Sequence, residues 1–166
     1  NELGAAAAAY NADEKELCRL DEIYSAVKTP FEIRSGSEKV TRRFFKICNN
    51  GRESFTGLYK SLTEQGICKG HQCIAYGLYM RDNGIELSEG LAVYGYSICS
   101  AIVTNCVKLV PLSQLAGQKI LGESFELISS ASEKALFTDI NDIGISGAGF
   151  DLRAMQHERL YSRQYM

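Results

Sequence analysis

Histidine is scarce in this chain of 166 residues. Only His71 and His157 are present, and neither stands at a recognisable spacing from a nucleophile. Nucleophilic and acid–base catalysis both need a base within hydrogen-bond reach of the group that it activates. We therefore predict that the protein is not an enzyme, with no catalytic residues and no cofactor.

An excess of positive charge is missing as well. The formal net charge is −2, so no global basic field recruits nucleic acid. The start of the sequence lacks the pattern of a secretory signal. Residues 91–107 are uncharged but fall short of the ~20 residues that cross a membrane, and four of them are polar: Ser97, Ser100, Thr104 and Asn105. We expect a buried core helix there, in a cytoplasmic protein that binds neither nucleic acid nor a membrane.

No two cysteines form a CxxC pair, although the chain has six: Cys18, Cys48, Cys68, Cys73, Cys99 and Cys106. Hydrophobic residues make up 45% of the chain and charged residues 23%, which is typical of a soluble protein that can build a core. We interpret the cysteines as reduced, mostly buried and cytosolic, with disulfides as the alternative.

Two glycine motifs lack the residues that their chemistry requires. Residues 117–124 have the glycine spacing of a phosphate loop, but Glu123 takes the place of the lysine and would repel phosphate. Residues 144–148 resemble a nucleophile elbow, but Ala148 replaces the closing glycine. We interpret the first as a chance match within a helix and the second as a flexible loop.

A metal site is a stronger alternative than either glycine motif to a purely structural role for the residues concerned. Cys68, His71 and Cys73 lie within six residues, and thiolate and imidazole suit zinc or nickel. His157 is the only other histidine that could complete the site. On a helix, however, residues five apart lie on diverging faces. We expect structural thiols and no metal site, and keep a metal-binding helical protein as the alternative.

Polar and apolar residues nowhere alternate convincingly, and apolar residues instead recur at three- and four-residue steps. The sequence predicts an all-α fold: a single-domain helical bundle over residues 1–137, then a glycine-containing loop and a C-terminal docking tail over residues 138–166. After an alanine run at residues 5–9, helices are expected at 13–28, between Pro30 and Asn49, from Phe55 to about Gly66, and at 69–82, 88–109 and 111–136.

Capping and burial follow from the same patterns. Asp13 and Glu16 have the spacing of a capping box, and Ser88 is the expected cap of the helix over 88–109. The expected buried residues are Leu17, Leu20, Tyr24 and Val27 in the helix over 13–28; Ile33, Val40, Phe44, Ile47 and Cys48 in the next; and Leu115, Ile120, Leu121, Phe125 and Ile128 in the helix over 111–136.

Pro111 separates the two longest helical patterns. Proline blocks a helix interior but is tolerated in a first turn, so we expect a sharp corner there and a new helix starting near Pro111. Gln114 and Gln118 lie four residues apart, on one face of that helix. We interpret Pro111, Gln114, Gly117 and Gln118 as a structural corner whose glutamines hydrogen-bond the exposed ends of neighbouring helices.

The end of the sequence has a different character. Residues 139–150 contain three glycines and are expected to form an irregular loop. Residues 151–166 are rich in Arg, Tyr, His and Met without a strict apolar period, and Arg and Tyr are residues that anchor interfaces. We interpret them as a docking segment; a frayed terminus without a partner is the alternative.

Four segments resemble motifs of one family. Val110-Pro111-Leu112-Ser113-Gln114 with Gly117-Gln118 resembles the PLxQ-x-x-GQ signature of the urease accessory protein family UreF. Residues 155–163 look like its closing HE-x-LYSR motif, and residues 70–85 are similar to its GH…YG…G(I/V) helix. Residues 31–34 with 42–44 match its E-x-R…R-F segment. The segments follow the order of the family and span about residues 20–166.

Some positions depart from the family pattern. The family usually begins with a segment ending near an FSYSQGLE-like motif, which is absent here, as in a truncated start at Asn1. Ala116 stands where the family usually has an acidic residue, and Gln164 where it usually has leucine.

The resemblance implies a non-enzymatic, all-α, homodimeric scaffold in urease maturation. Such proteins join the accessory protein UreD (UreH in some bacteria) and the GTPase UreG, and the assembly delivers nickel to the urease apoenzyme. The resemblance also implies that the tail orders against UreD/UreH, near the surface that meets UreG. A guanidinium can bind a carboxylate with two hydrogen bonds, so Arg163 is the expected main anchor. The expected partner-binding residues are Met155, His157, Glu158, Tyr161, Ser162, Arg163 and Tyr165.

Overall fold

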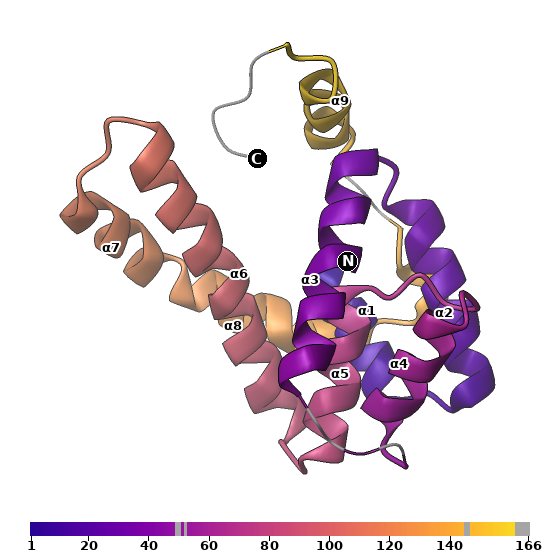
Figure 1. Ribbon diagram of the computed structural model, residues 1–166. Coiled ribbons are helices and arrows are strands. Elements are labelled where there is room, and N and C mark those ends of the chain that lie inside the picture. Colours follow the sequence, from indigo (N-terminus) through magenta and orange to yellow (C-terminus); the bar gives the residue numbers. More distant parts are fainter. Residues whose placement is uncertain (49–50, 52, 145–146, 162–166) are drawn as a thin grey trace.

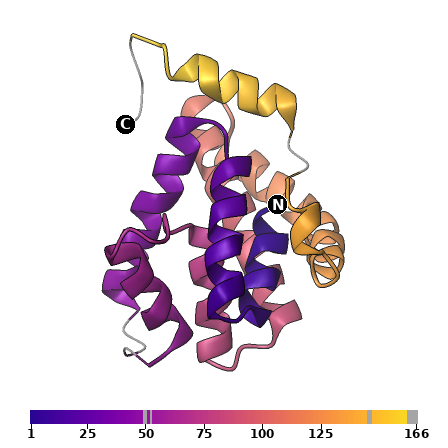
Figure 2. The same ribbon diagram turned by 90° about the vertical axis from the view of Figure 1, so that its right-hand side faces the viewer.

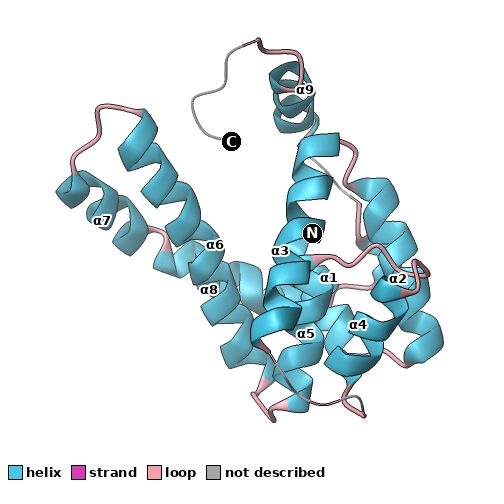
Figure 3. Ribbon diagram, viewed as in Figure 1, coloured by secondary structure: helices cyan, strands magenta, loops and turns pink. Residues whose placement is uncertain are grey.

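The computed structural model describes residues 1–48, 51, 53–144 and 147–161, and within these ranges the chain is helical, without strands (Figures 1 and 3). The all-α prediction is confirmed. The elements are α1 (Glu2–Asn11), α2 (Glu14–Val27), α3 (Phe31–Ile47), α4 (Phe55–Glu64), α5 (Gln72–Asp82), α6 (Leu87–Leu109), α7 (Gln114–Glu123), α8 (Phe125–Ala135), the 3₁₀ turn η1 (Ile140–Asp142) and α9 (Ala148–His157).

The alanine-rich helix α1 lies at the centre of the molecule (Figure 1). Ala5, Ala6 and Ala9 are fully buried, and α1 packs against α5, α6 and α8. Small side chains allow the α1 and α5 backbones to come unusually close. A Cβ atom added to Gly77 of α5 would lie 2.2 Å from the carbonyl oxygen of Ala6. The alanine run therefore serves packing as well as helix propensity.

Helix α2 follows the sequence prediction closely. The Asp13 side chain accepts a hydrogen bond from the Glu16 amide at 2.8 Å, and the Glu16 side chain accepts one from the Asp13 amide at 3.0 Å. The predicted capping box is thereby confirmed. Leu17, Leu20 and Tyr24 are buried as expected.

The predicted buried face of α3 is wrong. Val40 and Ile47 are exposed, Ile47 by 81%, and the buried residues are Ser37, Thr41 and Phe45. Small hydroxyl side chains can be buried here because both have partners. Thr41 Oγ1 donates to the Ser37 carbonyl, and Ser37 Oγ accepts from the Gln72 amide at the start of α5. The remaining expected residues, Ile33, Phe44 and Cys48, are half-buried.

A buried carboxylate fixes the segment between α4 and α5. Asp21 of α2 accepts hydrogen bonds from the Lys69 amide (2.7 Å), the Gly70 amide (3.1 Å) and the Tyr59 hydroxyl (2.6 Å). The Tyr59 oxygen in turn accepts from the His71 amide at 2.8 Å. An ionised carboxylate with three donors is well compensated for its burial. This network therefore ties α2, α4 and the start of α5 together.

Helix α6 leaves the body of the molecule and forms an arm with α7 and α8 (Figure 1). The prediction that residues 91–107 are buried is wrong for most of this stretch. Leu91 and Tyr94 are buried in the body, but Ile102 and Leu109 are exposed because α6 extends past its packing partners. The expected Ser88 cap is also wrong. Glu86 caps the helix, and its side chain accepts from the Glu89 amide at 3.1 Å.

The single helix expected over residues 111–136 is in fact two, α7 and α8, separated at Ser124. Among the expected core residues, Leu121 and Ile128 are buried, whereas Leu115, Ile120 and Phe125 are exposed. Leu115 is 81% exposed. The three- and four-residue spacing predicted helices correctly, but the helices of the arm are covered on one side only, so apolar residues on the other side are exposed.

By length and composition alone, α6 could cross a membrane, and 22% of its most apolar 18-residue stretch is buried. Its first turns insert into the body, and its remainder contacts α7 and α8 along one side.

The cysteines are free thiols, but they are less buried than predicted. Cys68 and Cys73 are buried, Cys18, Cys48 and Cys99 are half-buried, and Cys106 is exposed. The division of the chain at residues 137 and 138 stays a prediction.

Candidate partner-binding site

The C-terminal segment is more regular than the sequence suggested. Residues 148–157 form α9, where an irregular loop to Phe150 and an aperiodic tail were expected. Helix α9 lies across the end of the body where α2 leads into α3 (Figure 2). The prediction failed because the helix packs weakly, with no fully buried residue, so no strong apolar period marks it.

A carboxylate from the end of α9 caps α3. Pro30, the residue before α3, has no side chain that can accept a hydrogen bond, and no side-chain cap is present there. Glu158 Oε1 accepts from the Phe31 amide at 2.8 Å and from the Glu32 amide at 3.4 Å. These are first-turn amides that lack partners within their own helix, and a negative charge is favourable at a helix N-terminus.

A second contact joins the same two helices. His157 Nδ1 lies 2.7 Å from Glu32 Oε2, and both side chains are partly exposed to solvent. Together Glu32, His157 and Glu158 form what we call the α3–α9 clamp. The predicted orienting residues His157 and Glu158 thus contact this chain's own body. The sequence reasoning did not select Glu32, which lies in the segment resembling the E-x-R motif.

The two sides of α9 differ in character. Asp151, Ala154 and Glu158 are half-buried and recur at three- and four-residue steps, as expected for the side that contacts α3. Leu152 and Met155, three residues apart, are exposed, Leu152 by 60%. The apolar residues left exposed in or next to α9 are Phe150, Leu152, Met155, Leu160 and Tyr161. Polar contacts therefore hold α9, while most of its large apolar side chains face solvent.

The predicted partner-binding set is only partly visible. Met155 and Tyr161 are exposed, and His157 and Glu158 belong to the clamp. Ser162, Arg163 and Tyr165 lie outside the described residues.

The corner between α6 and α7 has a packing role. Ser113 caps α7 by accepting from the Ala116 amide at 3.1 Å, so the helix begins at Gln114 rather than near Pro111. Gly117 is buried, and a Cβ atom there would lie 2.7 Å from Val107 of α6. Pro111 is exposed in the turn.

The expected role of the two glutamines is wrong. Gln114 and Gln118 are both exposed. Neither side chain hydrogen-bonds a helix end within the part of the chain that the structure describes.

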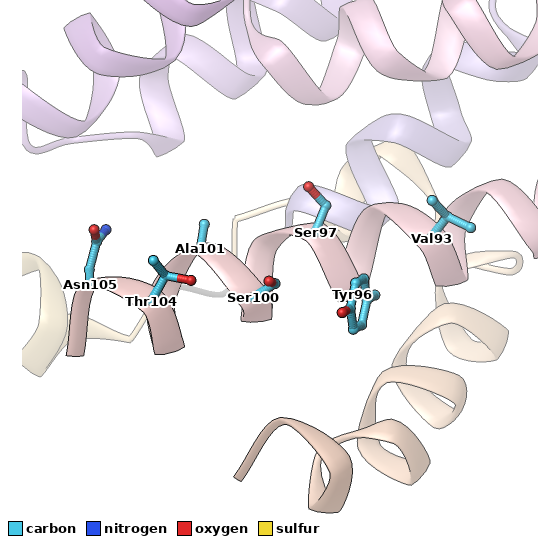
Figure 4. Close-up of a pocket in the computed structure, with 7 residues that line it drawn as sticks. All are labelled: Val93, Tyr96, Ser97, Ser100, Ala101, Thr104 and Asn105. Atoms are coloured by element: carbon cyan, nitrogen blue, oxygen red, sulfur yellow. The ribbon is translucent and has the colours of Figure 1, made fainter. Parts of the chain in front are cut away.

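A shallow hollow of about 480 Å³ runs along one side of α6. Figure 4 shows its lining, which comes entirely from this helix: Val93, Tyr96, Ser97, Ser100, Ala101, Thr104 and Asn105. Beside it, Leu91, Tyr94, Ile98, Ile102 and Leu109 follow at helical spacing and make an apolar stripe, which is buried in the body at its start and exposed at its end.

The rival metal site is not assembled. His71 is fully buried, and its Nε2 lies 2.7 Å from Ser25 Oγ, while the Cys68 thiol contacts Cys18. Burial lowers the pKa of His71 and raises that of Cys73. No group of three potential ligands among His, Cys, Asp and Glu gathers anywhere in the described ranges. Cys68, His71 and Cys73 thus do not gather into one set of ligands within the described residues.

The two glycine motifs likewise form no site that the structure describes. Residues 117–123 lie within α7, as the interpretation of a chance match requires. The centre of the elbow-like motif, residues 145 and 146, lies outside the described residues.

Comparison with known proteins identifies the family. The UreF family model matches residues 1–124, which is about three quarters of the chain. This chain belongs to the UreF family. Among its relatives is the urease accessory protein UreF of Actinobacillus pleuropneumoniae serotype 5b, 33% identical over 157 residues, which are 94% of this chain and 69% of that protein. The UreF of Haemophilus influenzae is 34% identical over 152 residues, covering 90% of this chain and 64% of that protein. The UreF of Paenarthrobacter aurescens is 30% identical over 151 residues, covering 89% and 66%.

The α3–α9 clamp is made by residues from two of the segments that resemble UreF motifs. Glu32 belongs to the segment that resembles the E-x-R motif of the family, and His157 and Glu158 belong to the segment that resembles its closing motif. These segments are more than 120 residues apart in sequence, yet the structure joins them through hydrogen bonds. In this UreF chain, two of the four family-like segments therefore form one structural unit, as part of an accessory protein of urease maturation.

Proposed function

We propose that this chain is a non-enzymatic scaffold that bridges UreD/UreH and the GTPase UreG, and that it regulates GTP-dependent insertion of nickel into the urease apoenzyme. Nickel is the cargo of that assembly and not a cofactor of this chain. The scaffold works in the cytoplasm, without binding nucleic acid or a membrane. Family membership supports the urease pathway, and the partners come from the family resemblance.

One observation carries the proposal: α9 is held by polar contacts and keeps apolar side chains exposed. A helix that served only to complete the fold would turn Leu152 and Met155 toward the body, because burying each stabilises by about 2 kcal/mol. Exposed apolar residues rimmed by polar ones are typical of protein interfaces. We infer that this side of α9 and the residues after it dock on UreD/UreH.

The individual roles follow from side-chain chemistry. Met155 adapts its shape to an apolar partner surface, and Tyr161 and Tyr165 bury large areas at little entropic cost. Arg163 supplies a bidentate hydrogen bond to a partner carboxylate, with Ser162 beside it. His157 and Glu158 set the orientation of the segment through the clamp.

A second surface is proposed for self-association. The apolar stripe of α6 continues from Leu91, buried in the body, to Leu109 in solvent, and residues 91–107 carry no charge. A second copy that covered its exposed end would continue the same packing along the helix. We therefore infer that the homodimer implied by the family resemblance uses the arm.

The experiment that tests the scaffold compares binding of the full chain and of a chain ending at Gly147 to UreD/UreH, with UreG added second. We expect the full chain to bind and the shortened chain to lose binding. The substitution Leu152→Asp should also weaken binding, because it places a charge in the apolar contact. The matched control is Ile47→Asp at the end of α3, where the isoleucine is 81% exposed and lies outside both proposed surfaces.

Equal binding by the full and shortened chains would contradict docking through α9. Binding lost equally in Leu152→Asp and Ile47→Asp would point to a general effect of added charge and would contradict docking through this side of α9. The circular dichroism of each variant should retain the helix content of the parent, because both side chains are exposed.

A further inference from the structure

Two cysteines that are far apart in sequence are neighbours in the fold. Cys18 lies in α2 and Cys68 lies in the segment between α4 and α5, and their Sγ atoms are 3.9 Å apart. The Cys68 thiol donates toward the Cys18 sulfur in an S–H···S contact. The two sulfurs of a disulfide lie about 2.05 Å apart. Rotating a cysteine side chain to another rotamer moves its sulfur by more than the remaining difference in distance.

The backbone holds Cys68 against α2. The amides of Ile67 and Cys68 both donate to the Leu62 carbonyl at the end of α4, at 3.0 and 3.2 Å. The next two amides, of Lys69 and Gly70, donate to Asp21, which is one turn after Cys18 on α2. Backbone hydrogen bonds on both sides of Cys68 thus fix the contact between the two thiols.

The two thiols differ in accessibility. Cys18 is half-buried and within reach of a small oxidant, whereas Cys68 is buried. Burial raises the pKa of the Cys68 thiol, and the Asp21 carboxylate and Cys18 raise it further. Because a thiolate is the reactive form, an oxidant attacks Cys18 first.

We propose that Cys18 and Cys68 are a redox pair that closes a reversible disulfide when the protein meets hydrogen peroxide. Peroxide oxidises the Cys18 thiol to a sulfenic acid and is itself reduced to water. The Cys68 sulfur then attacks the sulfenic sulfur, the S–O bond breaks, and the departing hydroxide takes the Cys68 proton as a second water. Two thiols and one peroxide thus give one disulfide and two waters.

The disulfide would fasten the segment between α4 and α5 to α2 by a covalent bond beside the Asp21 hydrogen bonds. It closes a loop of about 50 residues, which restricts the unfolded chain and so favours the folded one. The oxidised protein should therefore melt at a higher temperature than the reduced protein. A thiol reductant should reverse the change, because the bond can be opened by exchange.

The test treats the full chain with hydrogen peroxide under native conditions, blocks the remaining thiols and digests with trypsin. Cleavage after Lys15, Arg19, Lys60 and Lys69 places Cys18 in peptide 16–19 and Cys68 in peptide 61–69. We expect these two peptides joined by a disulfide and released by dithiothreitol. Cys106→Ser is the matched control, because it removes an exposed thiol elsewhere and should leave the joined peptides unchanged.

The single variants separate the two roles. In Cys68→Ser, Cys18 should proceed to sulfinic acid, because no resolving thiol is near. In Cys18→Ser, Cys68 should stay reduced under the same treatment. The proposal is overturned if peptide 16–19 of the parent carries sulfinic acid while Cys68 remains a thiol, or if either cysteine joins a different peptide.

Discussion

Gly77 has no side chain because the carbonyl of Ala6 occupies the space where a Cβ would lie. The obstacle is backbone, so no rotamer change on α1 can relieve the collision. The sequence does not reveal this contact, since Ala6 is one of five consecutive alanines, Gly77 stands between Tyr76 and Leu78, and the helix that each packs against is unknown until the fold is seen.

We predict that Gly77→Ala destabilises the protein by about 3 kcal/mol, the upper end of what an overpacked core methyl group costs. The measurement is the urea midpoint of unfolding followed by circular dichroism. Gly36→Ala in α3 is the matched control. Its added Cβ meets nothing within 4 Å, so it should stabilise by up to ~1 kcal/mol because alanine favours the helix. Similar loss in both variants would contradict the close α1–α5 approach.

His71 makes stability depend on pH. Burial lowers its pKa in the folded protein, while the unfolded chain keeps the ordinary value near 6.5. Between these two values the unfolded state binds more protons, so the free energy of unfolding falls as pH decreases below about 6.5. The slope approaches ~1.4 kcal/mol per pH unit within that window.

The measurement is the urea midpoint at pH 7.5 and 5.5, together with an NMR titration of the two imidazoles. The His71 resonance should remain that of neutral imidazole below pH 6.5, and the His157→Gln variant assigns the two resonances because it removes one of them. A His71 resonance that titrates at 6.5 or above would contradict the burial argument.

At the residue scale, the sequence predicted hydrogen bonds between residues close in sequence but not those between residues far apart in sequence. The Asp13 capping box was predictable because both partners lie within three residues of each other. The cap that Glu158 gives to α3 was not, because its partners are more than 120 residues away. A proline in the capping position was the available signal, since Pro30 has no acceptor and the first-turn amides need one from elsewhere.

At the scale of elements, the clamp gives α9 a stability of its own. Glu158→Ala removes the capping acceptor, at a cost of ~1 kcal/mol for a capping interaction. We expect hydrogen exchange of the amides in residues 151–157 to accelerate about fivefold, as that free energy requires. Exchange in α2 and α5 should stay as in the parent, because these helices do not depend on the clamp.

Glu133→Ala on α8 is the control for that experiment, because Glu133 is an exposed glutamate on a helix outside the clamp. Unchanged exchange in α9 of the Glu158 variant would mean that other contacts hold the helix. Faster exchange throughout the protein would mean that the clamp supports the core.

Element boundaries followed the sequence where capping residues or glycine turns mark them. Helices α2, α4 and α5 lie within the predicted ranges or within a few residues of them. The burial of α6 and α8 was overpredicted because an apolar residue reports only a preference for burial, not the partner that buries it. The sequence did not predict helix α9, because polar contacts hold it and few of its large side chains pack against the body.

At the scale of the molecule, the arm exposes apolar side chains that no other part of the described chain covers. We predict that the protein elutes with twice the mass of its 18.3 kDa chain in size-exclusion chromatography with light scattering. Ile102→Asp should shift it to the monomer, because a carboxylate in the covered stripe would be buried without a partner. Ile47→Asp is the control, since Ile47 is also an exposed isoleucine but lies on α3. A monomeric parent at all concentrations would contradict self-association.

The position of α1 has a consequence for biosynthesis. Its residues are made before those of the helices that bury it, α5, α6 and α8, which extend as far as Ala135. At ~5–20 residues per second, a ribosome needs on the order of ten seconds to synthesise the intervening chain. Until α5 has been made the alanine helix lacks its main packing partner, and its packing is complete only after residue 135 has been made. A chain that stops before α5 therefore lacks the centre of the fold, however much of its N-terminal sequence is intact.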